Sequence, residues 1–300
     1  MRTAVDLAVT ADFAVSSVTC TDHHASWSAP EAAGGHRVVL VRRGSFRRRA
    51  RDGVAELDGT AGYVSVPGEE EQFAHPAGGD VCTAVWVAPS LWRSVVGEEW
   101  PTRSVLHVDA TVELAHRQLL AAGGAVSGGG AVSGGRAVAG RRAVTGGGAP
   151  SGGGALSSGG AVADIAFGMA EALVRLVAST RDRPLPGVED RATVSAARAA
   201  ILADHPESRG LVPLARLLGV SPYRLSRAFS QDVGVSLTRF RNRVRVGRAM
   251  ARIQDGETDL AGLAAELGFA DQAHLTRTVR GLVGHTPTAL RRLLRPDATK

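Results

Sequence analysis

The chain has 300 residues, of which 44% are hydrophobic, and its formal net charge is +6. That length accommodates two domains of ordinary size, and no apolar run is long enough to predict a membrane-spanning helix. Two acidic residues, Asp6 and Asp12, interrupt the first apolar stretch, which argues against a signal peptide and predicts a cytoplasmic protein. The only cysteines, Cys20 and Cys82, are too few for a zinc cluster or a disulfide framework, and Cys82 is expected to be a buried free thiol.

Residues 36–88 are expected to form short strands. Stretches rich in β-branched or alternating residues, from "HRVVLVRRG" to "DVCTAVWVA", are separated by glycine, aspartate and proline turns. Such spacing predicts a small barrel or a sandwich. Arg47, Arg48 and Arg49 fall on one of these strands, so their side chains are expected to alternate between its two faces.

Beyond residue 109 the apolar spacing predicts two helices, at 109–122 and 162–179. The segment between them, 123–160, contains 16 glycines in 38 residues, and alanine recurs in it every six residues. A hexapeptide period is compatible with a β-helix, but this much glycine would bury little apolar surface and favours a flexible insertion. Prolines and mixed charges in "TRDRPLPGVEDR" (180–191) predict an interdomain linker.

Positive charge is concentrated after this linker. Residues 1–190 hold 17 arginines and 20 acidic residues, whereas residues 191–295 hold 17 arginines and only 8 acidic residues. A basic region of this kind is typical of a domain that binds a polyanion, although a solvated surface without a partner is the alternative.

The stretch "LVPLARLLGVSPYRLSRAF" (211–229) predicts a helix-turn-helix. Gly219 permits a sharp turn, Ser221 is a good N-cap, and Pro222 suits the first helical position. The second helix is expected to bury Leu225 and Phe229. The residues left near the exposed face of its first two turns are Tyr223, Arg224, Ser226 and Arg227.

A second copy follows fifty residues later. Gly268 and Asp271 take the places of the turn glycine and the N-cap, and Leu275 and Val279 take the buried positions. The residues expected on its exposed face are Gln272, Ala273, His274, Thr276 and Arg277. Between the copies, residues 236–256 predict one basic helix of about 30 Å, close to the 34 Å that separates adjacent major-groove faces. Two helical hairpins buried in a core are the alternative.

From about Val194 to Leu294 the sequence resembles the DNA-binding domain of AraC/XylS-type transcriptional regulators. The most specific segment is "LAAELGFADQAHLTRTVRGLVGHTPTALRR", and "GVSLTRFRNRVRVGRAM" resembles the linker helix of that family. One departure is Val279-Arg280-Gly281, where the family usually has a phenylalanine followed by basic residues.

This resemblance implies that the second helix of each copy reads bases in the major groove. Arginine pairs with guanine, glutamine with adenine, and alanine offers a methyl contact. The expected DNA-binding residues are Ser221, Tyr223, Arg224, Ser226, Arg227, Asp271, Gln272, Ala273, His274, Thr276 and Arg277. For His274, a phosphate contact and simple exposure stay open. For Arg224, Arg241, Arg243 and Arg245, the alternatives are phosphate contacts and solvated charge.

The N-terminal half resembles, more loosely, the cupin-like sensor domain found in the same family. The stretch "GYVSVPGEEEQFAHP" (62–76) has the strand, the Pro-Gly turn and the later histidine of a cupin. The His-x-His and glutamate of metal-binding cupins are absent, so His75 is expected to be a structural or surface residue. His23 and His24 are adjacent and make a poor pair of ligands. No metal and no cofactor are therefore expected.

These observations predict an α+β protein: a cupin-like β-barrel with a helical pair at 1–179, including the insertion 123–160, a linker at 180–191, and an all-α domain with two helix-turn-helix motifs at 192–300. The expected function is transcription regulation, without catalytic activity, through double-stranded DNA. A small-molecule effector, a second copy of the chain and RNA polymerase are further expected partners. A regulator without a small ligand and a cupin-type enzyme with a DNA-binding appendage remain alternatives, whereas a DNA-repair methyltransferase would need more cysteines.

Overall fold

The computed structural model describes residues 1–98, 101–128, 160–180 and 187–294. The chain divides into two compact units, Met1–Val108 with Ala115–Pro184, and Asp109–Leu114 with Leu185–Lys300. Most of the predicted glycine-rich insertion lies outside the described residues, and so does most of the predicted linker. Among the helices that are described, none is long and apolar enough to cross a membrane.

The first unit is rich in antiparallel strands. One sheet has six strands in the order β1-β2-β9-β4-β7-β10, and the other has four in the order β3-β8-β5-β6. The strands are β1 (Arg2–Val9), β2 (Phe13–Cys20), β3 (Glu31–Ala32), β4 (His36–Arg43), β5 (Phe46–Ala50), β6 (Gly53–Leu57), β7 (Ala61–Ser65), β8 (Glu70–Ala74), β9 (Asp80–Val87) and β10 (Val105–His107). The six strands from β4 to β9 lie in the predicted strand region, whereas β1, β2, β3 and β10 lie outside it.

Side chains from both sheets form one apolar core. Phe46, Leu57 and Phe73 come from the smaller sheet, and Val39 and Tyr63 come from the larger one. The coarse prediction of an α+β chain with strands first and helices last is confirmed, but a closed barrel is not. Within the described residues, the edge strands of each sheet do not pair with each other, so side-chain packing joins the sheets.

A buried ion-pair network also crosses this unit. On β5 the side chain of Arg48 is only 1% exposed, while Arg47 and Arg49 are exposed and lie over the ring of Trp27. The predicted alternation of the three arginines is therefore confirmed. The Arg48 guanidinium donates hydrogen bonds to Glu71 at 2.7 Å and to the Ser104 hydroxyl at 2.6 Å. These partners satisfy a charge that would otherwise be costly to bury.

In the described part of the chain, two helices and most of a third belong to the first unit, because the first residues of α2 (Ala110–Gly128), up to Leu114, group with the second unit. The other two are α1 (Pro89–Val95) and α3 (Gly160–Ser179). The two helices predicted at 109–122 and 162–179 correspond to α2 and α3, and α1 was not predicted. Helix α3 packs against β1 and β2, where the rings of Phe13 and Phe167 lie 6.1 Å apart.

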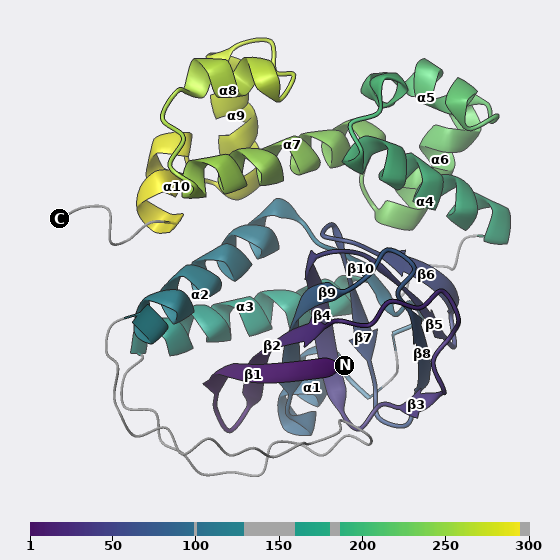
Figure 1. The fold of residues 1–300 in the computed structure, drawn as a ribbon, viewed down its shortest axis with the longest axis vertical. Coiled ribbons are helices and arrows are strands. Elements are labelled where there is room, and N and C mark those ends of the chain that lie inside the picture. Colours follow the sequence, from purple (N-terminus) through teal and green to yellow (C-terminus); the bar gives the residue numbers. More distant parts are fainter. Residues whose placement is uncertain (99–100, 129–159, 181–186, 295–300) are drawn as a thin grey trace. The chain divides into compact units, whose positions relative to one another are not determined.

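The described part of the second unit is helical (Figure 1). Its helices are α4 (Val188–Leu202), a short 3₁₀ helix (Pro206–Arg209), α5 (Leu211–Leu217), α6 (Pro222–Val233), α7 (Leu237–Gln254), α8 (Leu260–Glu266), α9 (Gln272–Val283) and α10 (Pro287–Leu294). Because α4 begins at Val188, the last residues of the predicted linker are helical.

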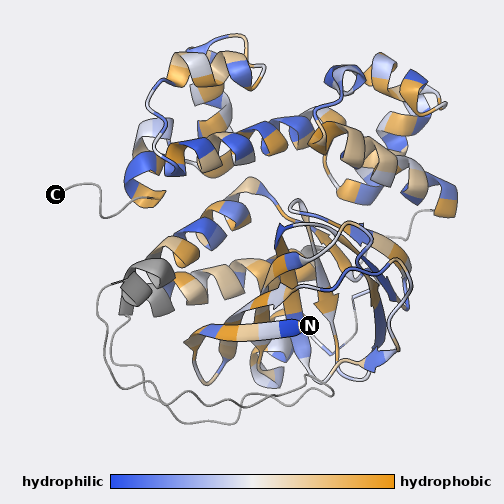
Figure 2. Cartoon of the chain, viewed as in Figure 1, coloured by the Kyte–Doolittle hydropathy of each residue, from blue (hydrophilic) through white to orange (hydrophobic). Residues whose placement is uncertain are grey.

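Helix α7 connects two separate apolar cores. Leu237, Phe240 and Val244 in its first half pack with residues of α4, α5 and α6. Met250 and Ile253 in its second half pack with residues of α8, α9 and α10. Hydrophilic and hydrophobic residues alternate along α7 in Figure 2, because the helix serves both cores and still carries six arginines. The predicted basic helix between the two copies is confirmed.

Candidate DNA-binding site

The first helix-turn-helix consists of α5 and α6. Gly219 connects them with φ of +67°, a left-handed conformation that glycine adopts without strain. Helix α6 then starts at a capped end, because the Ser221 hydroxyl accepts the Arg224 N–H at 3.2 Å and Pro222 follows. Leu225 and Phe229 are fully buried, as predicted.

The second helix-turn-helix, α8 and α9, repeats these features. Gly268 has φ of +73°, and the Asp271 carboxylate accepts the His274 N–H at 2.6 Å. Leu275 and Val279 are fully buried. Helices α6 and α9 each have 12 residues and start 50 residues apart. The same local chemistry thus builds two helices with the same buried side, one near each end of α7 (Figure 1).

The opposite side of each helix is polar and accessible. On α6, Tyr223 is 76% exposed, Arg227 is exposed and Ser226 is half-buried. On α9, the exposed predicted residues are Gln272, Ala273 and Arg277, and Thr276 is half-buried. The two arginines stand at equivalent positions, each two residues after the buried leucine. Their guanidinium groups offer paired donors that match the acceptors of a guanine edge.

Three of the predicted residues, besides Arg224, also have roles inside the domain. Ser221 and Asp271 cap their helices, so their side chains position the recognition helices whether or not they contact DNA. His274 accepts the Ala270 N–H through Nδ1 at 3.3 Å, and its ring lies edge-on to Phe269 at 5.3 Å. The structure therefore gives His274 a packing role in addition to its partial exposure.

Arg224 is held by two carboxylates of α4. Its guanidinium donates to Glu189 at 2.9 Å and to Asp190 at 3.1 Å. The hydrogen bond with Glu189, followed by that with Asp190, raises the pKa of Arg224. A phosphate contact by this arginine would have to compete with both acidic groups.

Two of the arginines that were expected to be solvated or phosphate-bound are buried. Arg241 and Arg243 on α7 are each only 8% exposed, which contradicts both expectations. Burial, followed by the nearby charge of Arg245, lowers the pKa of Arg241. Arg245 is half-buried, and its guanidinium lies 5.8 Å from the centre of the Phe269 ring. Helix periodicity alone did not reveal this burial, because the arginines occupy positions that contact neighbouring helices.

The first unit contains a cavity of about 50 Å³ between its two sheets. Its lining includes Tyr63, whose pKa burial raises to about 12, together with Cys20, His75, Asp80 and Cys82. His75 is buried, as a structural histidine would be, and its Nε2 lies 3.0 Å from the Asp80 carboxylate. The group was missed because its members are distant in the sequence. Knowing that β2 pairs with β9 would have placed Cys20 opposite Asp80.

Comparisons with known proteins identify the helical part of the chain. Residues 214–293 match a family described as "Helix-turn-helix domain". The chain is 32% identical over 79 residues to the HTH-type transcriptional regulator GlxA of Rhizobium meliloti (strain 1021), which covers 26% of this chain and 24% of that protein. The chain therefore aligns with about a quarter of the length of this curated relative.

Solved structures with detectable similarity include the C-terminal domain of AraT, a response regulator from Geobacillus stearothermophilus. It is 26% identical with a TM-score of 0.32, and the match covers 33% of this chain and 84% of that one. Unsaturated fatty acid bound ToxT from Vibrio cholerae strain SCE256 is 8% identical with a TM-score of 0.35 over 97% of this chain and 99% of that one. The predicted C-terminal helix-turn-helix domain is confirmed by the family match.

Proposed function

We propose that this chain, whose C-terminal part is an AraC-type helix-turn-helix domain, is a sequence-specific transcriptional regulator that reads two adjacent major-groove segments. The observation that carries the proposal is the duplication of one capped helix, with the same buried side and an accessible polar side, at the two ends of α7. The 18 residues of α7 span about 27 Å at the helical rise per residue, close to the 34 Å repeat of B-form DNA.

In this proposal each recognition helix contacts bases, and other arginines contact phosphates. Arg227 on α6 and Arg277 on α9 bind guanine edges, and Gln272 binds an adenine edge. Bases, or the sugar-phosphate backbone next to those bases, are contacted by the remaining predicted residues on the accessible faces: Tyr223, Ser226, Ala273 and Thr276. The surplus of arginine after residue 190 supplies the sequence-independent attraction to phosphate.

The first unit is proposed to be a cupin-like sensor. Two facing sheets with a lined cavity between them support this role, since ligand sites of β-rich domains are commonly enclosed by their sheets. A bound effector would then change DNA affinity, either directly or through association of two copies of the chain. A cytoplasmic location, contact with RNA polymerase and the absence of catalysis remain predictions that follow from this regulatory role.

A genomic map of binding sites tests the proposal. We expect one recurring motif with two short blocks about one helical turn apart. Arg227→Ala should relax the sequence preference of one block and Arg277→Ala that of the other, each at a cost of about 1–3 kcal/mol.

Arg280→Ala provides a matched control, because it removes the same charge from an exposed position later in α9. It should weaken binding uniformly and leave the motif unchanged. If Arg227→Ala and Arg277→Ala both keep full affinity and full sequence preference, α6 and α9 are not the recognition helices.

A further inference from the structure

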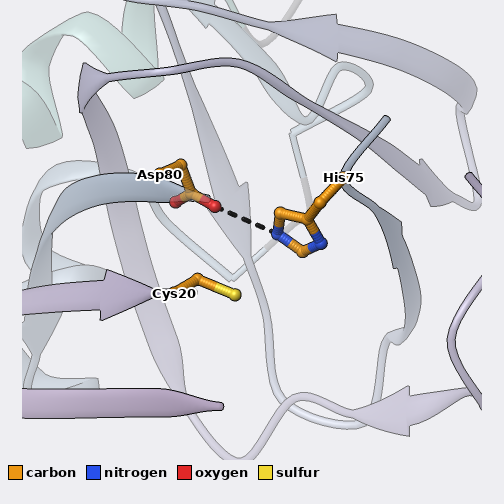
Figure 3. A group of neighbouring side chains, drawn as sticks. All are labelled: Cys20, His75 and Asp80. Atoms are coloured by element: carbon orange, nitrogen blue, oxygen red, sulfur yellow. Dashed lines mark ion pairs between the residues drawn. The ribbon is translucent and has the colours of Figure 1, made fainter. Parts of the chain in front are cut away.

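Three side chains that commonly bind metals lie close together in the lining of the cavity in the first unit. Cys20 is the last residue of β2, Asp80 is the first residue of β9, and the two are direct cross-strand partners. His75 follows β8, which belongs to the other sheet. The three potential ligand atoms all lie within 4.8 Å of one another (Figure 3).

The cluster is buried and incompletely satisfied. Cys20, His75 and Asp80 are 4%, 5% and 6% exposed. His75 Nε2 pairs with Asp80 Oδ2 at 3.0 Å, whereas His75 Nδ1 has no hydrogen-bond partner among the described residues. Buried polar atoms without partners are uncommon in proteins and call for a missing ligand or ion.

The chemistry of the three groups restricts the ion. A thiolate and an imidazole favour transition metals such as Zn²⁺, whereas Mg²⁺ and Ca²⁺ prefer oxygen ligands only. Two ligands of one tetrahedral Zn²⁺ lie about 3.3–3.8 Å apart at normal bond lengths. The distances observed here, 3.0 Å between His75 and Asp80 and at most 4.8 Å within the group, bracket that spacing.

We propose that Cys20 Sγ, a ring nitrogen of His75 and the Asp80 carboxylate bind a transition-metal ion, Zn²⁺ foremost, with the fourth position open to the cavity. The cavity of about 50 Å³ has room for a small exogenous ligand at that position. The sequence-based expectation of no metal weighed the cupin triad, the adjacent His23 and His24, and the small number of cysteines, but not this combination of one cysteine, one histidine and one aspartate.

Cys82 has a supporting role in this site. Its thiol donates to Asp80 Oδ1 at 3.0 Å, which leaves Oδ2 as the oxygen that faces His75. Cys82 thereby orients the carboxylate as an outer-shell partner, whose loss typically weakens metal binding by about 10- to 100-fold without removing a ligand.

Zn²⁺ and Co²⁺ titrations of the full chain without an affinity tag test the assignment. The wild-type chain should bind one Zn²⁺ in competition with a chromophoric chelator, and Co²⁺ should give a thiolate-to-metal absorption band. Cys20→Ser should abolish this band, and His75→Gln should weaken Zn²⁺ binding by more than 100-fold. Cys82→Ser should keep the band, and His23→Gln, a control at an exposed histidine, should change nothing.

If a variant fails to fold, the Zn²⁺ titration of the wild-type chain still tests the proposal. Absence of stoichiometric Zn²⁺ binding by the wild-type chain would overturn the proposal. A Co²⁺ band that survives Cys20→Ser and disappears in Cys82→Ser would also overturn it. DNA binding is measured separately, so failure of the metal site leaves the proposed regulatory function standing.

Discussion

The contact between Arg224 and two acidic residues predicts a variant that binds DNA more tightly. Glu189 and Asp190 accept hydrogen bonds from this arginine at 2.9 Å and 3.1 Å, at the exposed start of α6. The double variant Glu189→Gln and Asp190→Asn keeps hydrogen-bond acceptors but removes both charges. Arg224 is then free to contact a phosphate, and two repulsive groups beside the DNA are lost.

The salt dependence gives this prediction its magnitude. One additional phosphate contact raises the slope of log affinity against log salt by about 0.9. Over a fourfold change in salt, from about 50 mM to about 200 mM, that slope corresponds to a factor of about 3.5. The affinity gain of the double variant over the wild type should therefore be about 3.5 times larger at the lower salt concentration.

Fluorescence anisotropy with a labelled duplex, measured at both salt concentrations, provides the assay. The charge-matched control is Glu257→Gln with Glu266→Gln, which releases Arg252 on α7 from contacts of 2.9 Å and 2.8 Å. This control changes the net charge equally without freeing a residue of a recognition helix. Equal gains for the two double variants, or a gain that is independent of salt, would refute a specific role for Arg224.

Three further predictions concern stability. Arg48→Met should destabilise the first unit by at most about 3–5 kcal/mol, because the buried carboxylates of Glu69 and Glu71 lose the guanidinium that pairs with both and keep only Arg51 and Arg37. Tryptophan fluorescence during urea unfolding reports this, since all four tryptophans precede residue 109. Gly219→Ala should lower the free energy of unfolding by about 1–2 kcal/mol, because of its left-handed conformation alone, whereas Gly281→Ala inside α9 should raise it by about 1 kcal/mol. Neither added Cβ meets an atom within 4 Å. Unfolding followed by circular dichroism measures both changes, and a change in the same direction for the two variants would contradict this reasoning. Burial lowers the pKa of His116 to about 3, so the folded state resists protonation and stability falls by up to about 1.4 kcal/mol per pH unit below about pH 6.5. His116→Gln should remove that acid sensitivity, and an unchanged pH profile would exclude the histidine as its source.

The helix-turn-helix pair was predictable because local chemistry determines it. Gly219 and Ser221 mark the turn and the helix start, and Leu225 and Phe229 mark the buried side within a few residues. The second copy repeats those signals fifty residues later, so each copy supports the prediction of a helix-turn-helix for the other. Strands β4, β5, β6, β7 and β9 were predictable for the same reason, since turn residues separate them, whereas β8 carries three acidic or amide side chains in a row and was not recognised.

Features that depend on tertiary packing could not be predicted in this way. Arg241 and Arg243 look like surface charges in the sequence, but tertiary packing leaves each only 8% exposed. The cluster of Cys20, His75 and Asp80 depends on strand pairing between residues about sixty apart and on two facing sheets. Strand β1 was missed because its acidic residue breaks the apolar run that would have indicated a strand.

The spacing between the two blocks of the binding site tests the central claim most directly. Once the motif is mapped, duplexes are prepared with 0, 5 or 10 extra base pairs between the blocks, about no turn, half a turn and one turn of B-form DNA. With α7 as a rigid connection, we expect the 5- and 10-base-pair insertions to reduce affinity to that of a single block. Full affinity for the duplex with 5 extra base pairs would contradict simultaneous reading of one duplex by α6 and α9.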